Sequence, residues 1–290
     1  MTKKKLTFWV CDYSEKTGEG NLARKFIENF YKNSKIDVKT LKFSNLFNHK
    51  YIIPFIGIFT CWKYYLKGHA IGYINYLPLW NFLIFALLPP KTILGPITGG
   101  AFYGKTNLIN FFIRKFIFLI FYKLSEFILN IRHKNELLFS TELLKNNLSK
   151  KTIKRCKFNF VLDNLKIKKK KIKDIDFLIY YRKHNNKLTF FKYNFLENLI
   201  KYQFKILIVG DKLSIKGVKN LGFINKKKIS ELQSRTKYSL CSGENIYSLF
   251  VIECITNHVK ILIDKHHMKK IKFFKKFFIN IDNFNLNSNQ

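Results

Sequence analysis

Apolar residues in the first part of the chain occur in short runs separated by polar turns. An apolar run at 6–10 is followed by a glycine-bearing turn at 17–21 and by a helical pattern at 22–31. A second apolar run at 38–43 completes the order strand, turn, helix, strand, which is typical of the start of a doubly wound α/β unit. Further strands are predicted at 70–76, 92–94 and 136–140.

The same alternation restarts after a lysine-rich segment. Six lysines within 165–174 indicate a solvated linker. Beyond it the pattern predicts strands and helices of a second parallel sheet. Those strands are expected at 176–181, 204–209, 238–240 and 259–263, and the helices at 195–202, 229–234 and 249–255.

The chain is therefore expected to form two Rossmann-like α/β domains that face a cleft. The predicted division is an N-terminal domain at 1–164, a linker at 165–174 and a C-terminal domain at 175–290. Ligands of such folds bind at the carboxyl ends of the strands. The final residues, 266–290, are expected to form one helix, which leaves the second domain shortened.

The longer apolar stretches are too short to cross a membrane. Those at 51–62 and 76–90 are each interrupted by a proline, and a spanning helix needs about 20 apolar residues. A helical pattern at 108–129 carries three basic residues and reads as an amphipathic helix, buried or lying at an interface. We expect a cytoplasmic protein with a peripheral position on the inner face of a membrane.

The chain is strongly basic, with 53 Lys plus Arg against 18 Asp plus Glu and a formal net charge of +35. Lysine dominates this excess, whereas nucleic-acid recognition relies on arginine, so nucleic acid is not an expected partner. An anionic membrane surface is the better candidate partner. Five scattered cysteines without a CxxC or CxxH pair give no disulfide framework or zinc motif. No metal or cofactor is expected.

Two cations follow the first predicted strand of the second domain. Arg182 and Lys187 are five residues apart on the loop that begins at the carboxyl end of 176–181. Fixed positive charges at this place can straddle a diphosphate and stabilise it as a leaving group. The competing interpretation is a pair of solvated loop charges.

A second candidate anion site lies where the strand at 238–240 meets a polar loop and an apolar helix. The first backbone N–H groups of such a helix lack intrahelical acceptors and can bind an anion. Glu253, on the same helix, can accept both hydroxyls of a ribose, and a polar side chain at the mouth of the loop can contact a sugar. The candidate residues of this segment are Glu244, Asn245, Tyr247, Ser248, Leu249 and Glu253.

These residues stand in a segment that resembles the donor domain of group 1, family-4-type, retaining glycosyltransferases of the GT-B fold. The resemblance rests on the order of four motifs. They are GVKNLGFI at 217–224, ISEL at 229–232, SGEN at 242–245 leading to Glu253, and VKILID at 259–264. Arg182 and Lys187 match the arginine and lysine that hold the donor pyrophosphate in that family. Glu253 matches its ribose-binding glutamate.

The family's two glutamates are eight residues apart, whereas Glu244 and Glu253 are nine apart. Alignment on Glu253 places Asn245 at the first glutamate position, so both Glu244 and Asn245 are candidates for contact with the sugar. The catalytic residues that the resemblance implies are Arg182, Lys187, Glu244 and Asn245.

The resemblance extends to the first domain, so that it covers most of 5–264. Gly18-Glu19-Gly20 looks like the N-terminal glycine loop of the family, and GPITGG at 95–100 resembles a loop of acceptor-side domains. The acceptor-side residues implied in this way are Gly18, Gly20, Asn75, Gly95, Gly99 and Gly100.

The resemblance implies transfer of a hexose from a nucleoside-diphosphate sugar to a saccharide or lipid-linked acceptor, without a metal, in the biosynthesis of a surface polysaccharide or lipopolysaccharide. A degenerate protein that binds the nucleotide sugar without turnover is an alternative. A second alternative is a phosphate-loop NTPase, because 99–106 match G-x-x-x-x-G-K-[ST] through Gly99, Gly104, Lys105 and Thr106.

Overall fold

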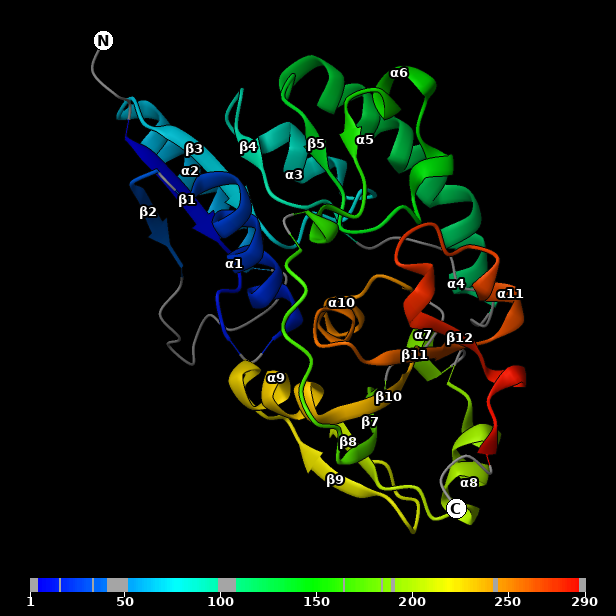
Figure 1. The fold of residues 1–290 in the computed structure, drawn as a ribbon. Helices are drawn as coiled ribbons and strands as arrows, with labels where there is room; N and C mark the ends of the chain where they lie inside the picture. The colour runs from blue at the N-terminus through cyan, green and yellow to red at the C-terminus, as the bar shows by residue number, and fades with distance from the viewer. Residues whose placement is uncertain are drawn as a thin grey trace. The chain divides into compact units, whose positions relative to one another are not determined.

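The computed structural model describes residues 5–15, 17–32, 34–40, 52–98, 108–163, 165–183, 185–188, 191–241 and 245–286. The chain divides into two compact units, 1–163 and 164–290. The first unit contains a four-stranded sheet and the second a six-stranded sheet, and the strand pairs of both are parallel (Figure 1). The predicted α/β class with two parallel sheets is therefore confirmed, and the arrangement around a cleft stays a prediction.

The first unit begins with the strand, helix, strand order that the sequence predicts. Its main sheet has the order β2-β1-β3-β4. The elements are β1 (Leu6–Val10), α1 (Gly18–Tyr31), β2 (Ile36–Lys39), α2 (Ile53–Leu66), β3 (Ala70–Ile74), α3 (Phe82–Leu87) and β4 (Ile93–Leu94). The rest are α4 (Leu108–Phe112), a π-helical turn (Ile113–Ile117), α5 (Phe118–Arg132), β5 (Leu137–Leu138), α6 (Lys150–Ile153), β6 (Cys156–Lys157) and 3₁₀ turns at Lys145–Asn147 and Phe160–Leu162.

Strand β1 is buried on both faces because its side chains alternate between two helices. Phe8 faces α1, where its ring centroid lies 5.0 Å from that of Tyr31. Trp9 belongs to the cluster that includes Ile58 of α2. Helices α1 and α2 therefore cover opposite faces of the sheet, as in a doubly wound unit (Figure 1).

Helix α2 corrects the interpretation of 51–62 as an interrupted apolar stretch. Pro54 lies in the first turn of the helix, where a missing N–H costs little. Gly57 faces the indole of Trp9, and a Cβ at this position would lie 2.2 Å from Trp9 Nε1. The glycine permits close helix packing and does not break the helix.

The predicted glycine turn at 17–21 is also wrong, because α1 already begins at Gly18. Thr17 is the N-cap residue, and its Oγ1 accepts a hydrogen bond from the Gly20 N–H at 3.0 Å. A Cβ on Gly20 would lie 2.0 Å from the Ser14 carbonyl oxygen. Glycine is therefore required at position 20, because the backbone of Ser14 lies too close for any side chain.

The second unit repeats the doubly wound pattern with the order β12-β11-β10-β7-β8-β9. Its strands are β7 (Ile175–Tyr181), β8 (Ile206–Gly210), β9 (Lys219–Gly222), β10 (Thr236–Leu240), β11 (Lys260–Ile263) and β12 (Phe278–Asn280). Its helices are α7 (Asn185–Leu188), α8 (Tyr193–Lys201), α9 (Lys226–Arg235), α10 (Leu249–Thr256) and α11 (Lys265–Met268), with 3₁₀ turns at Lys275–Phe277 and Ile281–Asn283.

The predicted C-terminal helix is wrong, because the segment after β11 forms the short α11 and then β12. Strand β12 pairs in parallel with β11, Ile261 standing opposite Phe278. The hydroxyl of Tyr247 fixes the connecting segment, since it accepts the N–H groups of Lys272 at 3.0 Å and Phe273 at 2.8 Å. The conformation of this segment is therefore determined by its pairing with β11 and its hydrogen bonds to Tyr247.

The turn before β11 has a left-handed residue that is not glycine. His258 adopts a left-handed conformation with φ of 59°, a conformation that glycine adopts most readily. Its N–H donates to the Ile255 carbonyl at 3.0 Å, which closes the end of α10.

In the part of the chain that the structure describes, no helix is both long enough and apolar enough to span a bilayer.

Candidate functional site

The strand order of the second unit defines where a ligand is expected to bind. From β7 the chain proceeds to β8 and β9 on one side of the sheet, and then to β10, β11 and β12 on the other. The order therefore reverses between β7 and β10. In open parallel sheets the loops that diverge from such a point leave a crevice at the carboxyl ends of the strands.

Arg182 lies at this carboxyl edge, directly after β7. Its Nε donates to Asp211 Oδ2 at 3.2 Å, and its Nη1 donates to the Tyr180 hydroxyl at 3.1 Å. The guanidinium also lies over the ring of Phe223, 5.2 Å from its centroid. These contacts orient the side chain, which is still 42% exposed and so accessible to an anion.

Asp211 follows β8, and the pairing of Tyr181 with Gly210 brings it beside Arg182. The same carboxylate oxygen accepts the Lys183 N–H at 2.7 Å. Burial lowers the pKa of Arg182, but its bonds to Tyr180 and Asp211 outweigh this effect, and the pKa is raised. The guanidinium is therefore a fixed positive charge.

Lys187, the second predicted cation, lies in α7 after the same strand and is partly buried. Sequence reasoning found Arg182 and Lys187 but missed Tyr180, Asp211 and Phe223 as groups that hold the arginine. Asp211 carried a usable signal, because it directly follows the predicted strand at 204–209.

The second half of the candidate site follows β10 at the same edge of the sheet. Ser248 is the N-cap of α10, and its Oγ accepts the Val251 N–H at 3.4 Å. Its own N–H donates to the Asn245 carbonyl at 3.2 Å. The Ser248 N–H is therefore already hydrogen-bonded within a turn. The N–H groups in the first turn of α10 that lack an intrahelical acceptor are those of Leu249 and Phe250.

Tyr247 is buried, and its hydroxyl forms hydrogen bonds with the backbone of Phe273. Its side chain therefore holds the segment between α11 and β12 in place. Glu253 lies one turn into α10, with its side chain 27% exposed and a carboxylate oxygen 3.8 Å from Lys226 Nζ of α9. Asn245 is partly buried just before the helix. Glu244 lies outside the described residues.

The first unit also reverses its strand order, between β1 and β3. Asn75 follows β3 and is 1% exposed, with a left-handed φ of 72°. Its Nδ2 donates to the carbonyl oxygens of Asp12 at 2.7 Å and Glu19 at 3.1 Å. The side chain thus ties the end of β1 to the first turn of α1.

Glu19 is a carboxyl with a raised pKa in this part of the first unit. From the sequence alone it is interpreted only as part of a glycine loop. Burial, and next the charge of Asp12, raise the pKa of Glu19 to about 7. Within the described part of the chain, Glu19 Oε2 and Asn75 Oδ1 are buried without a hydrogen-bond partner. A carboxyl with a pKa near 7 can give or take a proton.

Of the remaining acceptor-side residues, only Gly95 is closely packed among those that the structure describes. Gly18 is the first residue of α1 and has open space around it. The Gly95 N–H donates to the Tyr73 carbonyl at 2.8 Å, and a Cβ on Gly95 would lie 2.9 Å from Ile74 Cα. Gly99 and Gly100, together with the whole phosphate-loop pattern at 99–106, lie outside the described residues.

Comparison with known proteins finds similarity only at the level of structure. No protein-family model and no curated protein sequence matches the chain. The UDP-GlcNAc 2-epimerase of Methanocaldococcus jannaschii, solved with UDP-GlcNAc and UDP, is similar with a TM-score of 0.46 and 16% identity, over 89% of this chain and 83% of that one.

The glycosyltransferase of kitacinnamycin is similar with a TM-score of 0.44 and 8% identity, over 99% of this chain and 88% of that one. The E. coli heptosyltransferase WaaC has a TM-score of 0.35 and 8% identity, over 95% of this chain and 92% of that one. None of these TM-scores reaches 0.5, so membership of the retaining group 1 family stays a prediction.

Proposed function

We propose that this protein is a glycosyltransferase that takes a hexose from a nucleoside-diphosphate sugar. One observation carries the proposal. An oriented guanidinium after β7 and the start of α10 after β10 lie at the two strands between which the order of the sheet reverses. A diphosphate bound there would meet a fixed cation and a helix N-terminus.

In the proposed reaction the bond between the sugar and the diphosphate breaks, and negative charge grows on the departing phosphate. Arg182 and Lys187 neutralise that charge, and the N-terminus of α10 adds its positive dipole end. Glu253 accepts hydrogen bonds from the ribose hydroxyls. Asn245 and Glu244 contact the transferred sugar. These roles require no metal, and they match a retaining transferase of the group 1 type.

We assign the acceptor to the first unit, at the carboxyl edge of its sheet, where the Asn75 side chain ties the end of β1 to the start of α1. A saccharide or a lipid-linked saccharide fits the proposal, as in the assembly of a surface polysaccharide or lipopolysaccharide. Gly20 and Gly95 allow close backbone approach in this part of the unit, and Gly18 has open space around it. Gly99 and Gly100 follow β4 in the sequence.

Thermal-shift titration with UDP, GDP, ADP and their sugars tests the proposal, followed by an assay for sugar transfer and donor hydrolysis. A stabilising nucleotide together with turnover supports the transferase. Binding without turnover or hydrolysis indicates the non-catalytic alternative. Loss of binding in Lys105→Ala, with binding retained in Arg182→Ala, would instead support the phosphate-loop NTPase.

Replacement of Glu253 by glutamine is expected to weaken binding of the stabilising nucleotide about tenfold, because a neutral amide accepts the ribose hydroxyls less strongly than a carboxylate. Isothermal titration calorimetry measures this change. Inorganic pyrophosphate has no ribose, so its affinity is expected to stay unchanged. Glu231→Gln, in an exposed pair with Lys228 on α9, is the matched control. An equal loss for nucleotide and pyrophosphate would contradict the ribose role.

A further inference from the structure

The helical segment at 108–132 exposes many large apolar side chains. Most of them are three or four residues apart, the spacing of neighbouring positions on a helix surface. Six of them are at least half exposed, namely Ile109, Phe112, Phe116, Ile120, Phe127 and Ile131. We call these six residues the docking face. Exposed clusters of this size on a protein surface mark an interaction site.

The neighbouring helices extend this surface. Helix α3 packs against α5 and α2, with the ring centroids of Phe82 and Phe121 5.3 Å apart and the Trp62 Nε1 donating to the Leu87 carbonyl at 2.7 Å. Both neighbours also expose large apolar side chains. These are Leu83 and Leu87 on α3 and Phe55, Phe59 and Leu66 on α2.

The apolar surface is accompanied by positive charge. The segment carries Arg114, Lys115 and Lys123, and α2 carries Lys63, whereas α2 and α3 contain no acidic residue. The only acid of the segment, Glu126, is buried, and its Oε1 accepts the Ser149 N–H at 2.7 Å. An apolar face bordered by cations complements a bilayer with anionic headgroups.

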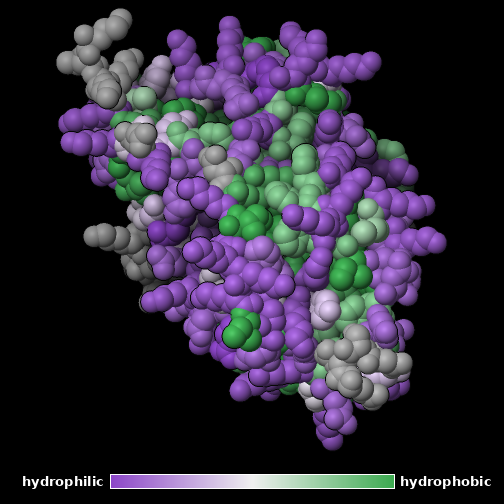
Figure 2. Space-filling view, viewed as in Figure 1, coloured by the Kyte–Doolittle hydropathy of each residue, from purple (hydrophilic) through white to green (hydrophobic). Residues whose placement is uncertain are grey.

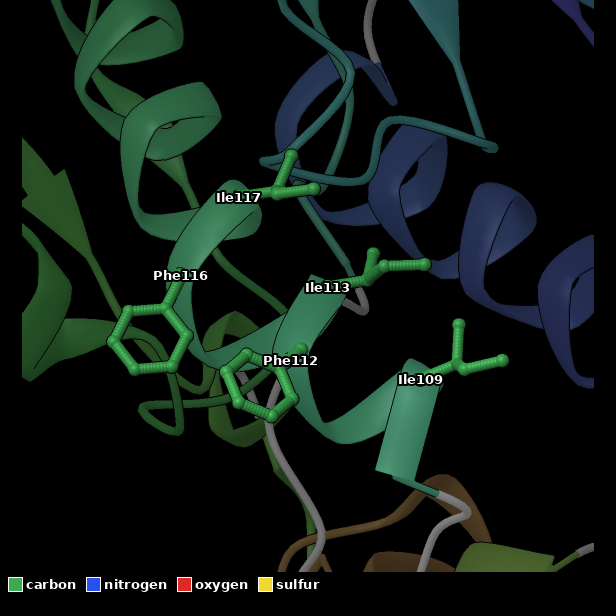
Figure 3. Close-up of a pocket in the computed structure, with 5 residues that line it drawn as sticks. All are labelled: Ile109, Phe112, Ile113, Phe116 and Ile117. Carbon is green, nitrogen blue, oxygen red and sulfur yellow. The ribbon is translucent and has the colours of Figure 1, made fainter.

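The start of the segment forms a hollow lined only by hydrocarbon. Its volume is about 550 Å³, and Ile109, Phe112, Ile113, Phe116 and Ile117 line it. Figure 3 shows the three isoleucines projecting to one side of the helical turn and the two phenylalanines to the other. Such a hollow offers no hydrogen bond to a polar ligand and suits an acyl chain.

A protein partner would need acidic groups opposite these cations, whereas the outer layer of an anionic bilayer supplies both acyl chains and negative headgroups. Figure 2 shows hydrophobic residues among mostly hydrophilic ones on the side of the molecule seen in Figure 1. We propose that the docking face inserts into the headgroup layer of an anionic membrane, with Arg114 and Lys115 contacting the phosphates.

Vesicle flotation with the full chain tests this proposal. Vesicles of phosphatidylglycerol mixed with phosphatidylcholine are compared with vesicles of phosphatidylcholine alone. The wild type is expected to bind the anionic vesicles at least tenfold more tightly, since each cation near the surface contributes about fivefold. Arg114→Gln with Lys115→Gln is expected to lower this binding about tenfold or more, and high salt is expected to lower it as well.

The apolar contribution is tested by the triple variant Phe112→Ser, Phe116→Ser and Phe127→Ser, which is expected to keep less than a tenth of the wild-type binding. Ile172→Ser is the matched control, because Ile172 is 90% exposed in the second unit and lies outside the docking face. Equal binding by the triple variant, or no wild-type preference for anionic vesicles, would overturn the proposal. A dimer that the triple variant dissociates, without vesicle binding, would identify a second copy as the occupant and also overturn it.

The proposal does not rest on the nucleotide-sugar site. The triple variant is expected to bind the stabilising nucleotide as the wild type does, because the docking face lies in the first unit and the donor residues lie in the second. Failure of nucleotide binding and failure of vesicle binding are therefore separate results.

Discussion

Replacement of Arg182 by alanine is expected to weaken binding of the stabilising nucleoside diphosphate about a hundredfold. The guanidinium can form two charge-assisted hydrogen bonds to a phosphate, and each such bond contributes on the order of tenfold. Tyr180, Asp211 and Phe223 orient this group in the free protein. Isothermal titration calorimetry with the nucleotide, and separately with pyrophosphate, measures the loss.

Arg235 offers a matched control within the same unit. It also pairs with an aspartate, Asp174, but both lie at the amino edge of the sheet, just before β10 and β7. Arg235→Ala is expected to leave nucleotide affinity unchanged. Asp211→Asn, which weakens the hold on Arg182, is expected to give an intermediate loss of about tenfold. Equal affinities for the Arg182 and Arg235 variants would exclude the proposed diphosphate site.

Replacement of Glu19 by glutamine is expected to remove a large pH dependence of stability. The pKa of Glu19 is about 7 in the folded chain against an ordinary value of 4.5. Between these two pH values the folded state therefore holds a proton that the unfolded state loses. Stability from this group is fully present below pH 4.5 and is lost as the pH rises through 7. The loss amounts to about 3 kcal/mol.

Urea denaturation of wild type and Glu19→Gln across this pH range measures the effect. The variant is expected to be more stable than the wild type at alkaline pH and nearly equal to it at acidic pH. Glu28→Gln, at an exposed position of the same helix, is the matched control. Asp12, Tyr76 and Cys11 interact electrostatically with Glu19 and are unchanged in both variants. Parallel pH profiles for wild type and Glu19→Gln would show that Glu19 is not buried in this way.

Local patterns sufficed for the parts of the fold that are buried on both sides. Strands β1, β7, β8 and β11 are short continuous apolar runs, because their side chains face a helix layer on each face of the sheet. The same periodicity placed Arg182 at the end of a strand. It placed Ser248 at the start of a helix, where its Oγ caps α10.

Local patterns failed where a distant contact decides the conformation. The apolar stretch at 51–62 was interpreted as interrupted, but α2 spans it, and Gly57 lets this helix pack closely against the indole of Trp9. The tail after β11 suggested a helix, but pairing with β11 makes 278–280 a strand. Glu19 gave no signal in the sequence, because its raised pKa depends on burial and on Asp12.

The sequence by itself determined two parallel α/β units and the place along the chain of Arg182, Asn245 and Glu253, because alternation of apolar and polar residues is a local property. Only the tertiary structure decided that Asp211 and Tyr180 orient Arg182, that Asn75 ties β1 to α1, and that large apolar side chains of 108–132 stay exposed. These features depend on which strands become neighbours. Strand order is set by packing of the whole sheet, which no short stretch of sequence contains.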